Sequence, residues 1–155
     1  APDMESRKVI CADADKDGDV DLLFTNVNFR GNKNPQNKLY INNGKGKFTD
    51  ETNSRLPKDD DHSIDASFLD IDGDSDLDII VANVFGGKIK TYLNDGKGIF
   101  SMGSDRLLGG KIQIDALGIA IGDLNGDGEN DIYICDRYNP QVDNKDVLLL
   151  REKRK

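Results

Sequence analysis

Three short runs of alternating acidic residues are the part of the sequence whose residue types and spacing could do chemistry. In each run, positions 1, 3, 5 and 9 carry an oxygen-bearing side chain, and at least three of these four are carboxylates. Position 7 could add its backbone carbonyl, because a glycine at position 6 of two runs permits a sharp turn. Oxygen ligands without histidine or cysteine suit a hard cation, so the pattern predicts up to three Ca²⁺ ions. The candidate metal ligands are Asp13, Asp15, Asp17, Asp19, Asp21, Asp70, Asp72, Asp74, Asp76, Asp78, Asp123, Asn125, Asp127, Glu129 and Asp131.

The twelfth position of each run excludes the helix-flanked calcium hand. That motif requires a bidentate glutamate at this position, where the sequence has Phe24, Val81 and Ile134. These three residues lie in short apolar runs that are typical of strands buried on both faces. We therefore expect each acidic loop to join one strand to the next.

The acidic runs recur at a nearly constant interval. Asp70 follows Asp13 by 57 residues, and Asp123 follows Asp70 by 53. A period of this size, with several short strands in each unit, is typical of a β-propeller. Asn43-Gly44 and Asp95-Gly96 are expected to close hairpins. The predicted strands are 7–12, 20–25, 38–42 and 48–51 in the first unit, 64–69, 77–82, 90–94 and 100–103 in the second, and 117–122, 131–135 and 146–150 in the third.

The predicted fold is all-β, with three consecutive four-stranded antiparallel propeller blades, the last incomplete, that together form a partial β-propeller. We expect a single propeller region over residues 1–155, with repeats at about 7–56, 64–108 and 116–150. Because propellers close with four to eight blades, three blades leave apolar faces that require a partner. Further blades of a longer parent chain or a second copy would supply it. The start at Ala1 and the shortened third repeat favour a fragment.

The pattern Asp-x-Asp-x-Asp-Gly-x-x-Asp between apolar strands, followed by Asn-Lys-Leu-Tyr-Ile-Asn-Asn-Gly-Lys-Gly-Lys-Phe at 37–48, resembles the FG-GAP/VCBS repeat. The resemblance extends from about Arg7 to Leu150. It implies the blades of a calcium-binding β-propeller, like those of integrin alpha subunits, fungal propeller lectins and many secreted bacterial proteins. It also implies that partners bind at the end away from calcium, but it does not indicate which partner.

Composition and the remaining reactive residues narrow the function further. A net charge of −8 and a pI near 4.6 argue against a nucleic-acid partner, and no apolar run is long enough to span a membrane. Cys11 and Cys135 are expected to be buried small hydrophobes, since two cysteines make no disulfide framework. His62 follows three aspartates and is expected to be a solvated loop residue and not a general base. We therefore expect no enzymatic activity.

The loops at the end opposite the acidic runs vary in composition and form the candidate ligand face. The candidates are Phe29, Arg30, Arg137 and Tyr138, although packing of the aromatic side chains against their own blades is an equally good reading. Two functions remain open. The first is an extracellular or periplasmic adhesion or ligand-binding module with a protein or glycan partner and structural calcium. The alternative is a non-catalytic propeller part of a larger secreted enzyme, and flanking sequence would discriminate between the two.

Overall fold

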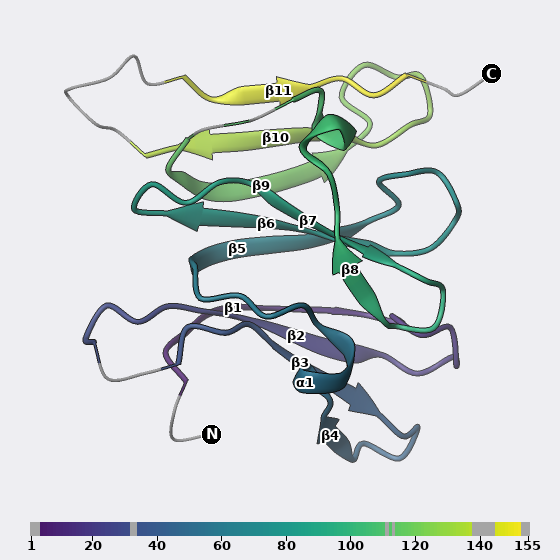
Figure 1. Cartoon of the computed structure of the whole chain (residues 1–155). Helices are drawn as coiled ribbons and strands as arrows, with labels where there is room; N and C mark the ends of the chain where they lie inside the picture. The colour runs from purple at the N-terminus through teal and green to yellow at the C-terminus, as the bar shows by residue number, and fades with distance from the viewer. Residues whose placement is uncertain (1–3, 32–33, 111, 113, 138–144, 153–155) are drawn as a thin grey trace.

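The computed structural model describes residues 4–31, 34–110, 112, 114–137 and 145–152. In this part of the chain, the strands form three antiparallel sheets of four, four and three strands, stacked one after another (Figure 1). We call these sheets blades one, two and three. The arrangement confirms the predicted all-β fold of consecutive antiparallel propeller blades, with the third blade incomplete in the described residues.

Each blade is an up-and-down meander in which neighbours in sequence are neighbours in the sheet. Blade one consists of β1 (Ser6–Ala12), β2 (Asp21–Asn26), β3 (Lys38–Asn42) and β4 (Phe48–Asp50). Blade two consists of β5 (His62–Leu69), β6 (Asp78–Val84), β7 (Lys90–Asn94) and β8 (Phe100–Met102). Blade three consists of β9 (Ala116–Gly122), β10 (Asp131–Asp136) and β11 (Val147–Leu149). The helical turns α1 (Thr52–Arg55) and η1 (Asp105–Leu108) follow the first two blades, and every strand boundary lies within two residues of its predicted position.

The hairpins between the third and fourth strands are longer than the predicted dipeptide turns. In blade one the last pair of the ladder is Asn42 with Phe48, and the backbone nitrogen of Asn43 donates to the carbonyl of Lys47 at 3.2 Å. Positive φ occurs at Gly44 and Gly46, at 73° and 71°, and not at Asn43. The asparagine side chain instead accepts from the backbone of the loop, so Asn-Gly begins a longer loop in place of forming a two-residue turn.

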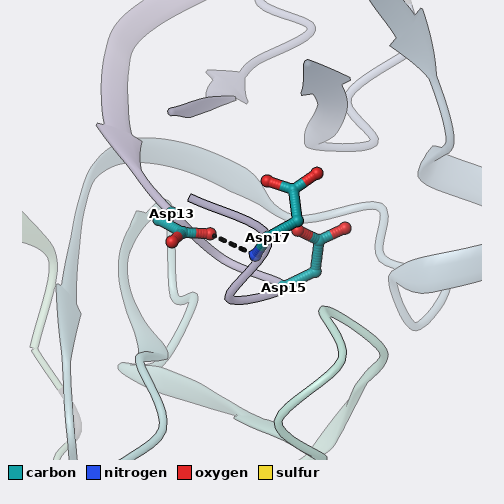
Figure 2. Close-up of side chains that lie close together, drawn as sticks. All are labelled: Asp13, Asp15 and Asp17. Carbon is teal, nitrogen blue, oxygen red and sulfur yellow. Dashed lines mark hydrogen bonds between the residues drawn. The ribbon is translucent and has the colours of Figure 1, made fainter. Parts of the chain in front are cut away.

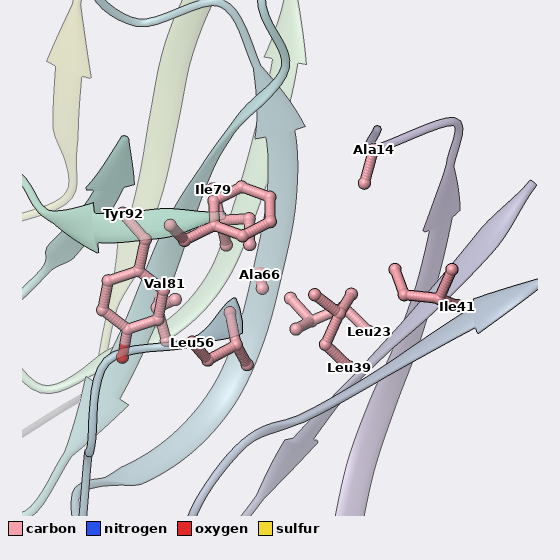
Figure 3. Packing of buried hydrophobic residues seen from close by; sticks show 10 residues of the cluster. Ala14, Leu23, Leu39, Ile41, Leu56, Ala66, Ile79, Val81 and Tyr92 are labelled. Atoms are coloured by element: carbon pink, nitrogen blue, oxygen red, sulfur yellow. The ribbon is translucent and has the colours of Figure 1, made fainter. Parts of the chain in front are cut away.

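The hydrophobic core lies between the blades and is divided into two clusters. The first joins blades one and two (Figure 3), and it contains Leu23, Leu39 and Ile41 on one side and Ala66, Ile79, Val81 and Tyr92 on the other. The second joins blades two and three, and it contains Ile80, Ala82, Ile119, Ile132 and Ile134. Because a blade lies against each side of blade two, every residue of β6 is buried.

Two burial predictions are wrong for the end blades. In β2, Leu22 and Phe24 are only half-buried, because no blade in the described chain covers the outward face of blade one. Cys11 and Cys135 are free, exposed thiols. Cys11 pairs with Leu22 on the outward side of blade one, and Cys135 alternates with the buried Ile134 on blade three. Among the described strands, the second strand is therefore buried on both faces in the middle blade alone.

Candidate metal centres

The three acidic loops connect the first and second strands of their blades and lie at the same end of the stack, on the right in Figure 1. The aspartate at position 1 organises each loop. In loop one, Asp13 accepts a hydrogen bond from the backbone nitrogen of Asp17 at 3.1 Å (Figure 2), and another from that of Gly18 at 3.0 Å. Asp70 and Asp123 accept the equivalent bonds from position 6 of their own loops, both at 3.0 Å. The sequence thus closes each loop around its first carboxylate.

The aspartate at position 9 has a structural role that sequence reasoning missed. One oxygen of the buried Asp21 accepts from the backbone nitrogen of Ala14 at 3.0 Å, and the other accepts from that of Asn42 at 2.9 Å. Asp78 and Asp131 make the same pair of bonds in their blades. Each of these carboxylates therefore ties its loop to the third strand or, in blade three, to Arg151 just after it. Burial raises the pKa of Asp21 and of Asp78 above the usual range.

Carboxylates converge in the first two loops. Oxygens of Asp13, Asp15 and Asp17 lie within 4.8 Å of one another (Figure 2), as do those of Asp70, Asp72 and Asp78. The described residues show no such triplet of acids in loop three. There, Asn125 replaces the acid at position 3 and donates from its amide nitrogen to Asp127 at 3.0 Å.

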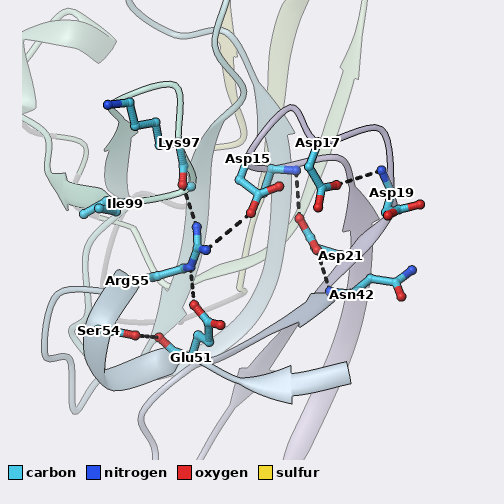
Figure 4. Close-up of polar contacts among 12 residues, drawn as sticks. Asp15, Asp17, Asp19, Asp21, Asn42, Glu51, Ser54, Arg55, Lys97 and Ile99 are labelled. Carbon is cyan, nitrogen blue, oxygen red and sulfur yellow. Dashed lines mark hydrogen bonds and ion pairs between the residues drawn. The ribbon is translucent and has the colours of Figure 1, made fainter. Parts of the chain in front are cut away.

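One oxygen of Asp15 indicates that loop one fits a cation. Oδ1 of this side chain is buried and has no hydrogen-bond partner among the described residues. The other oxygen lies 3.3 Å from the guanidinium of Arg55, which also binds Glu51 and the carbonyl of Lys97 (Figure 4). Burial, together with the charge of Asp17, raises the pKa of Asp15. A buried carboxylate oxygen without a donor is costly, and Ca²⁺, which binds only oxygen in such sites, would satisfy it.

The side chains at position 7 do not join these clusters. A Cβ atom on Gly44 would lie 2.3 Å from Oδ2 of Asp19, and one on Gly96 would lie 2.6 Å from Oδ2 of Asp76. These two carboxylates therefore pack against the hairpins of their own blades, where only glycine leaves room for them. Asp76 also forms an ion pair with Lys16 of loop one. The predicted contribution of Asp19, Asp76 and Glu129 through their carbonyls stays a prediction.

Each loop requires left-handed backbone at two positions. Position 6 has φ of 94° at Gly18, 72° at Ser75 and 91° at Gly128, so the serine of loop two adopts a conformation that favours glycine. Position 4 is also left-handed, with φ of 60° at Lys16, and loops two and three have glycine there. Sequence reasoning identified the first requirement but missed the second. Loops one and two therefore each hold one strained residue.

Asp59, Asp60 and Asp61 form a third acidic cluster, but protein groups already satisfy it. The ammonium of Lys90 lies 3.3 Å from Asp59 and forms a second ion pair with Asp61. The hydroxyl of Tyr92 donates to the other oxygen of Asp59. Because Lys90 already neutralises Asp59 and Asp61, we assign no metal to this cluster.

At the opposite end of the stack, the predicted ligand-face residue Phe29 belongs to a cluster of rings. Phe29 is 44% exposed and stacks on His62 with ring centroids 5.5 Å apart. Phe85, which is 57% exposed, packs edge-on against both rings. His62 is thus the half-buried first residue of β5 and not a solvated loop residue, and its Nδ1 accepts from the backbone of Asn28 at 3.1 Å.

Two arginines extend this cluster across all three blades. The guanidinium of Arg7 lies 4.6 Å from the ring centre of Phe29, and that of Arg137 lies 5.2 Å from that of Phe85. Arg30 is exposed in the loop after β2 and Tyr138 lies outside the described residues. Sequence reasoning missed Phe85, although the glycines that follow it signal an unusual turn, and its φ is 60°.

The fold and the acidic loops define a propeller-like module built from repeated antiparallel blades. The FG-GAP-like repeat family matches the chain at residues 13–81 and again at 70–134. Each match runs from the first aspartate of one loop to the second strand of the next blade. Together the matches cover most of the chain, and the protein belongs to this family, as the resemblance implied. No curated protein matches the sequence. None of the helices described is long and apolar enough to cross a membrane.

Proposed function

We propose that the protein is a calcium-binding β-propeller module for adhesion or ligand binding, in which calcium is structural. The observation that carries the proposal is the convergence of Asp13, Asp15 and Asp17 around a buried carboxylate oxygen that lacks a donor. Asp70, Asp72 and Asp78 provide a second group of converging carboxylates. Loop three, with Asn125, is the weakest of the three proposed sites.

The carboxylates would coordinate the ion, and hydrogen bonds and an ion pair from the protein would fix the positions of the carboxylates. Asp13 is fixed by the loop amides, and Arg55 links Asp15 to the hairpin of blade two. When bound, Ca²⁺ supplies positive charge that offsets repulsion among the acids. Three ions would change the formal net charge from −8 to −2, since each adds two positive charges.

We place the ligand-binding face at the opposite end, where loops from all three blades meet. A rigid scaffold with variable loops is a common basis for recognition, and exposed aromatic rings beside arginines suit a protein or glycan surface. We also propose that the chain is not an enzyme. FG-GAP-like repeats are typically extracellular, and sites of this kind suit compartments where calcium is abundant, so we propose an extracellular or periplasmic location. The outward faces of the end blades require further blades, from a longer parent chain or a second copy.

Thermal unfolding with calcium and with a chelator tests the proposal. An ion that binds only the folded state stabilises it by about 2.7 kcal/mol per site at a hundredfold excess over the dissociation constant. We expect calcium to raise the melting temperature of the wild type and to raise it less in the double variant Asp15→Asn, Asp72→Asn. Asp60→Asn, which lies in the cluster that Lys90 neutralises, is the matched control and should respond like the wild type. Coincident melting curves of the wild type with and without calcium would refute the proposal.

A further inference from the structure

The outward face of blade one is an open apolar surface. Leu22, Phe24, Tyr40 and Phe48 line a hollow of about 420 Å³ together with Met4 and Ser6. Val9, which pairs with Phe24 on the same side of the sheet, is 50% exposed. We call this surface the leading face of blade one.

The leading face of blade two shows what such a surface contacts. Leu22 pairs with Tyr40 in blade one as Ile79 pairs with Tyr92 in blade two, so these positions are equivalent in the repeat. Phe24 and Val81 are equivalent by the same register, since each pairs with the lysine that begins the third strand. In blade two, Ile79, Val81 and Tyr92 are fully buried against blade one. A leading face is therefore a surface that the preceding blade covers.

Blade three has the complementary surface uncovered. Leu23 and Leu39 pair on the opposite, trailing face of blade one and are fully buried beneath blade two. Their equivalents on blade three are Tyr133 and Leu148, which pair in the same register. Leu148 is 48% exposed, and Leu150, beyond it, is 55% exposed. The described residues thus leave the leading face of blade one and the trailing face of blade three open.

We propose that the leading face of blade one binds the trailing face of blade three of a second copy of this chain, in a head-to-tail contact. Both interfaces within the chain pair a trailing face with a leading face, and a second copy carries the trailing face that blade one lacks. The contact continues the stacking already present, and it buries apolar surface on both sides. Because the two faces differ, the contact is heterologous, and it closes into a ring or continues into a longer stack. The inference extends the proposed propeller function, but it rests on the stacking and not on calcium.

A contact at the first interface fixes the expected register. The hydroxyl of Thr25 donates to the carbonyl of Ile64 at 3.4 Å across blades one and two. Ile134 of blade three and Phe24 of blade one are equivalent, because each pairs with the first residue of its third strand. Cys135 and Thr25, which follow them, are therefore equivalent as well. Arg7, like Ile64, is the bulged residue of its first strand. The proposed contact therefore places Cys135 of one copy beside Arg7 of the next.

Paired substitutions at exposed positions of the two faces test the proposal without disturbing the core. The measurement is light scattering of the full chain at micromolar concentration, with calcium and with a chelator. The wild type is expected to exceed 17.1 kDa, and Val9→Lys and Leu148→Lys are each expected to return it to the mass of a monomer. Mixing the two variants should restore association, because each retains the face that the other has lost. Lys45→Ser, in the exposed hairpin of blade one and away from both faces, serves as the control and should associate like the wild type.

A monomeric wild type would overturn the proposal, as would loss of association in only one variant, since that result means that a face pairs with itself. Cross-linking provides an independent readout. In a Cys11→Ser background, Arg7→Cys is expected to form intermolecular disulfides with Cys135, and the background protein alone is not. Equal cross-linking of the two proteins would overturn the head-to-tail register. A calcium-dependent shift in melting temperature combined with a monomer would refute this inference and leave the proposed function in place.

Discussion

The carboxamide of Asn94 donates a hydrogen bond of 2.7 Å to the carbonyl oxygen of Ala14, and this bond joins blade two to the acidic loop of blade one. The contact recurs one repeat later. Arg151 follows β11 at the equivalent position, and its guanidinium donates to the carbonyl of Ile71 in loop two at 3.3 Å. The backbone nitrogens of Asn94 and Arg151 also donate to the position-9 aspartates of their own blades. Each of the first two acidic loops is therefore held by the blade that follows it.

Asn94→Ala should cost more stability than Asn42→Ala, which is its matched control. Asn42 occupies the same position in blade one, and among the described residues its carboxamide donates to Val20 in its own blade and to no loop of another blade. Oδ1 of Asn94 also accepts from the backbone nitrogen of Gly98 at 2.9 Å, whereas Oδ1 of Asn42 accepts from that of Gly44. The difference between the two variants therefore reports the inter-blade bond together with the bond from Gly98, and we expect at least about 1 to 2 kcal/mol because the buried carbonyl of Ala14 loses its donor. Urea unfolding of both variants measures it. Equal losses would show that the bond to Ala14 contributes nothing.

Ser75→Gly should stabilise the ion-free protein, because Ser75 holds a φ of 72°. Removing the Cβ from a left-handed residue relieves on the order of 1 kcal/mol. Gly128→Ser is the reciprocal variant, since a Cβ at Gly128 meets no atom within 4 Å and φ alone opposes it. It should destabilise by a similar amount. Chemical denaturation in chelator gives both values, and a change of the same sign in both variants would contradict the explanation by strain.

Asn125→Asp should raise the calcium affinity of loop three. The substitution restores the fourth acidic ligand of the pattern and removes the amide that now binds Asp127. In calorimetric titration we expect the weakest site of the wild type to tighten. Asn130→Asp adds the same charge to the same loop at a position outside the ligand pattern. If both variants tighten binding equally, general electrostatic attraction explains the effect and the ligand assignment of position 3 fails.

Stability should fall as pH rises through about 10. Burial and the Asp59 carboxylate raise the pKa of Tyr92 above its usual 10.0. Burial alone would lower the pKa of Lys90, but its bond to Asp61 and the charge of Asp59 raise it above 10.5. The unfolded chain therefore releases these protons first, and the free energy of unfolding falls by up to about 1.4 kcal/mol per pH unit for each group.

Tyr92→Phe should flatten this alkaline decline, and Tyr133→Phe, at a half-buried tyrosine whose hydroxyl donates to Asp146 at the surface, should flatten it much less. Urea unfolding between about pH 8 and pH 11 provides the comparison. Identical slopes for the wild type and Tyr92→Phe would mean that the buried hydroxyl is not responsible.

Sequence alone predicted the strands and the loops because both depend on local pattern. The period of the acidic runs and the apolar residues after them place β2, β6 and β10 directly. The exposure of Cys11 and Cys135 could not be predicted in the same way. It depends on which blades have a neighbour on each side, and a local pattern does not contain this information. The strands of the end blades have the apolar composition of buried strands, and only the stacking shows that half of that surface is open.

The sequence predicts which acidic residues belong to each loop, but it does not predict which of them bind the backbone of the loop and the blade. Spacing identifies Asp21 as an acid of the loop. The fold shows in addition that its two oxygens accept hydrogen bonds from the backbone nitrogens of Ala14 and Asn42. The ring cluster escaped prediction for a related reason. Phe29 and Phe85 are 56 residues apart in the chain, and their contact across 5.2 Å arises from the stacking of two blades.

The complete burial of β6 has a consequence for how such a chain can change in length. In the described residues, the extensive contacts between strands of different blades join consecutive blades, so stability accumulates as a sum of neighbour terms and not around one centre. Deleting the middle blade would remove two interfaces and bring a new pair of faces together. Duplicating a blade would add one unit and one interface while leaving existing contacts as they are. A gene encoding this protein can therefore grow by whole repeats, with each new copy meeting a surface that already fits it.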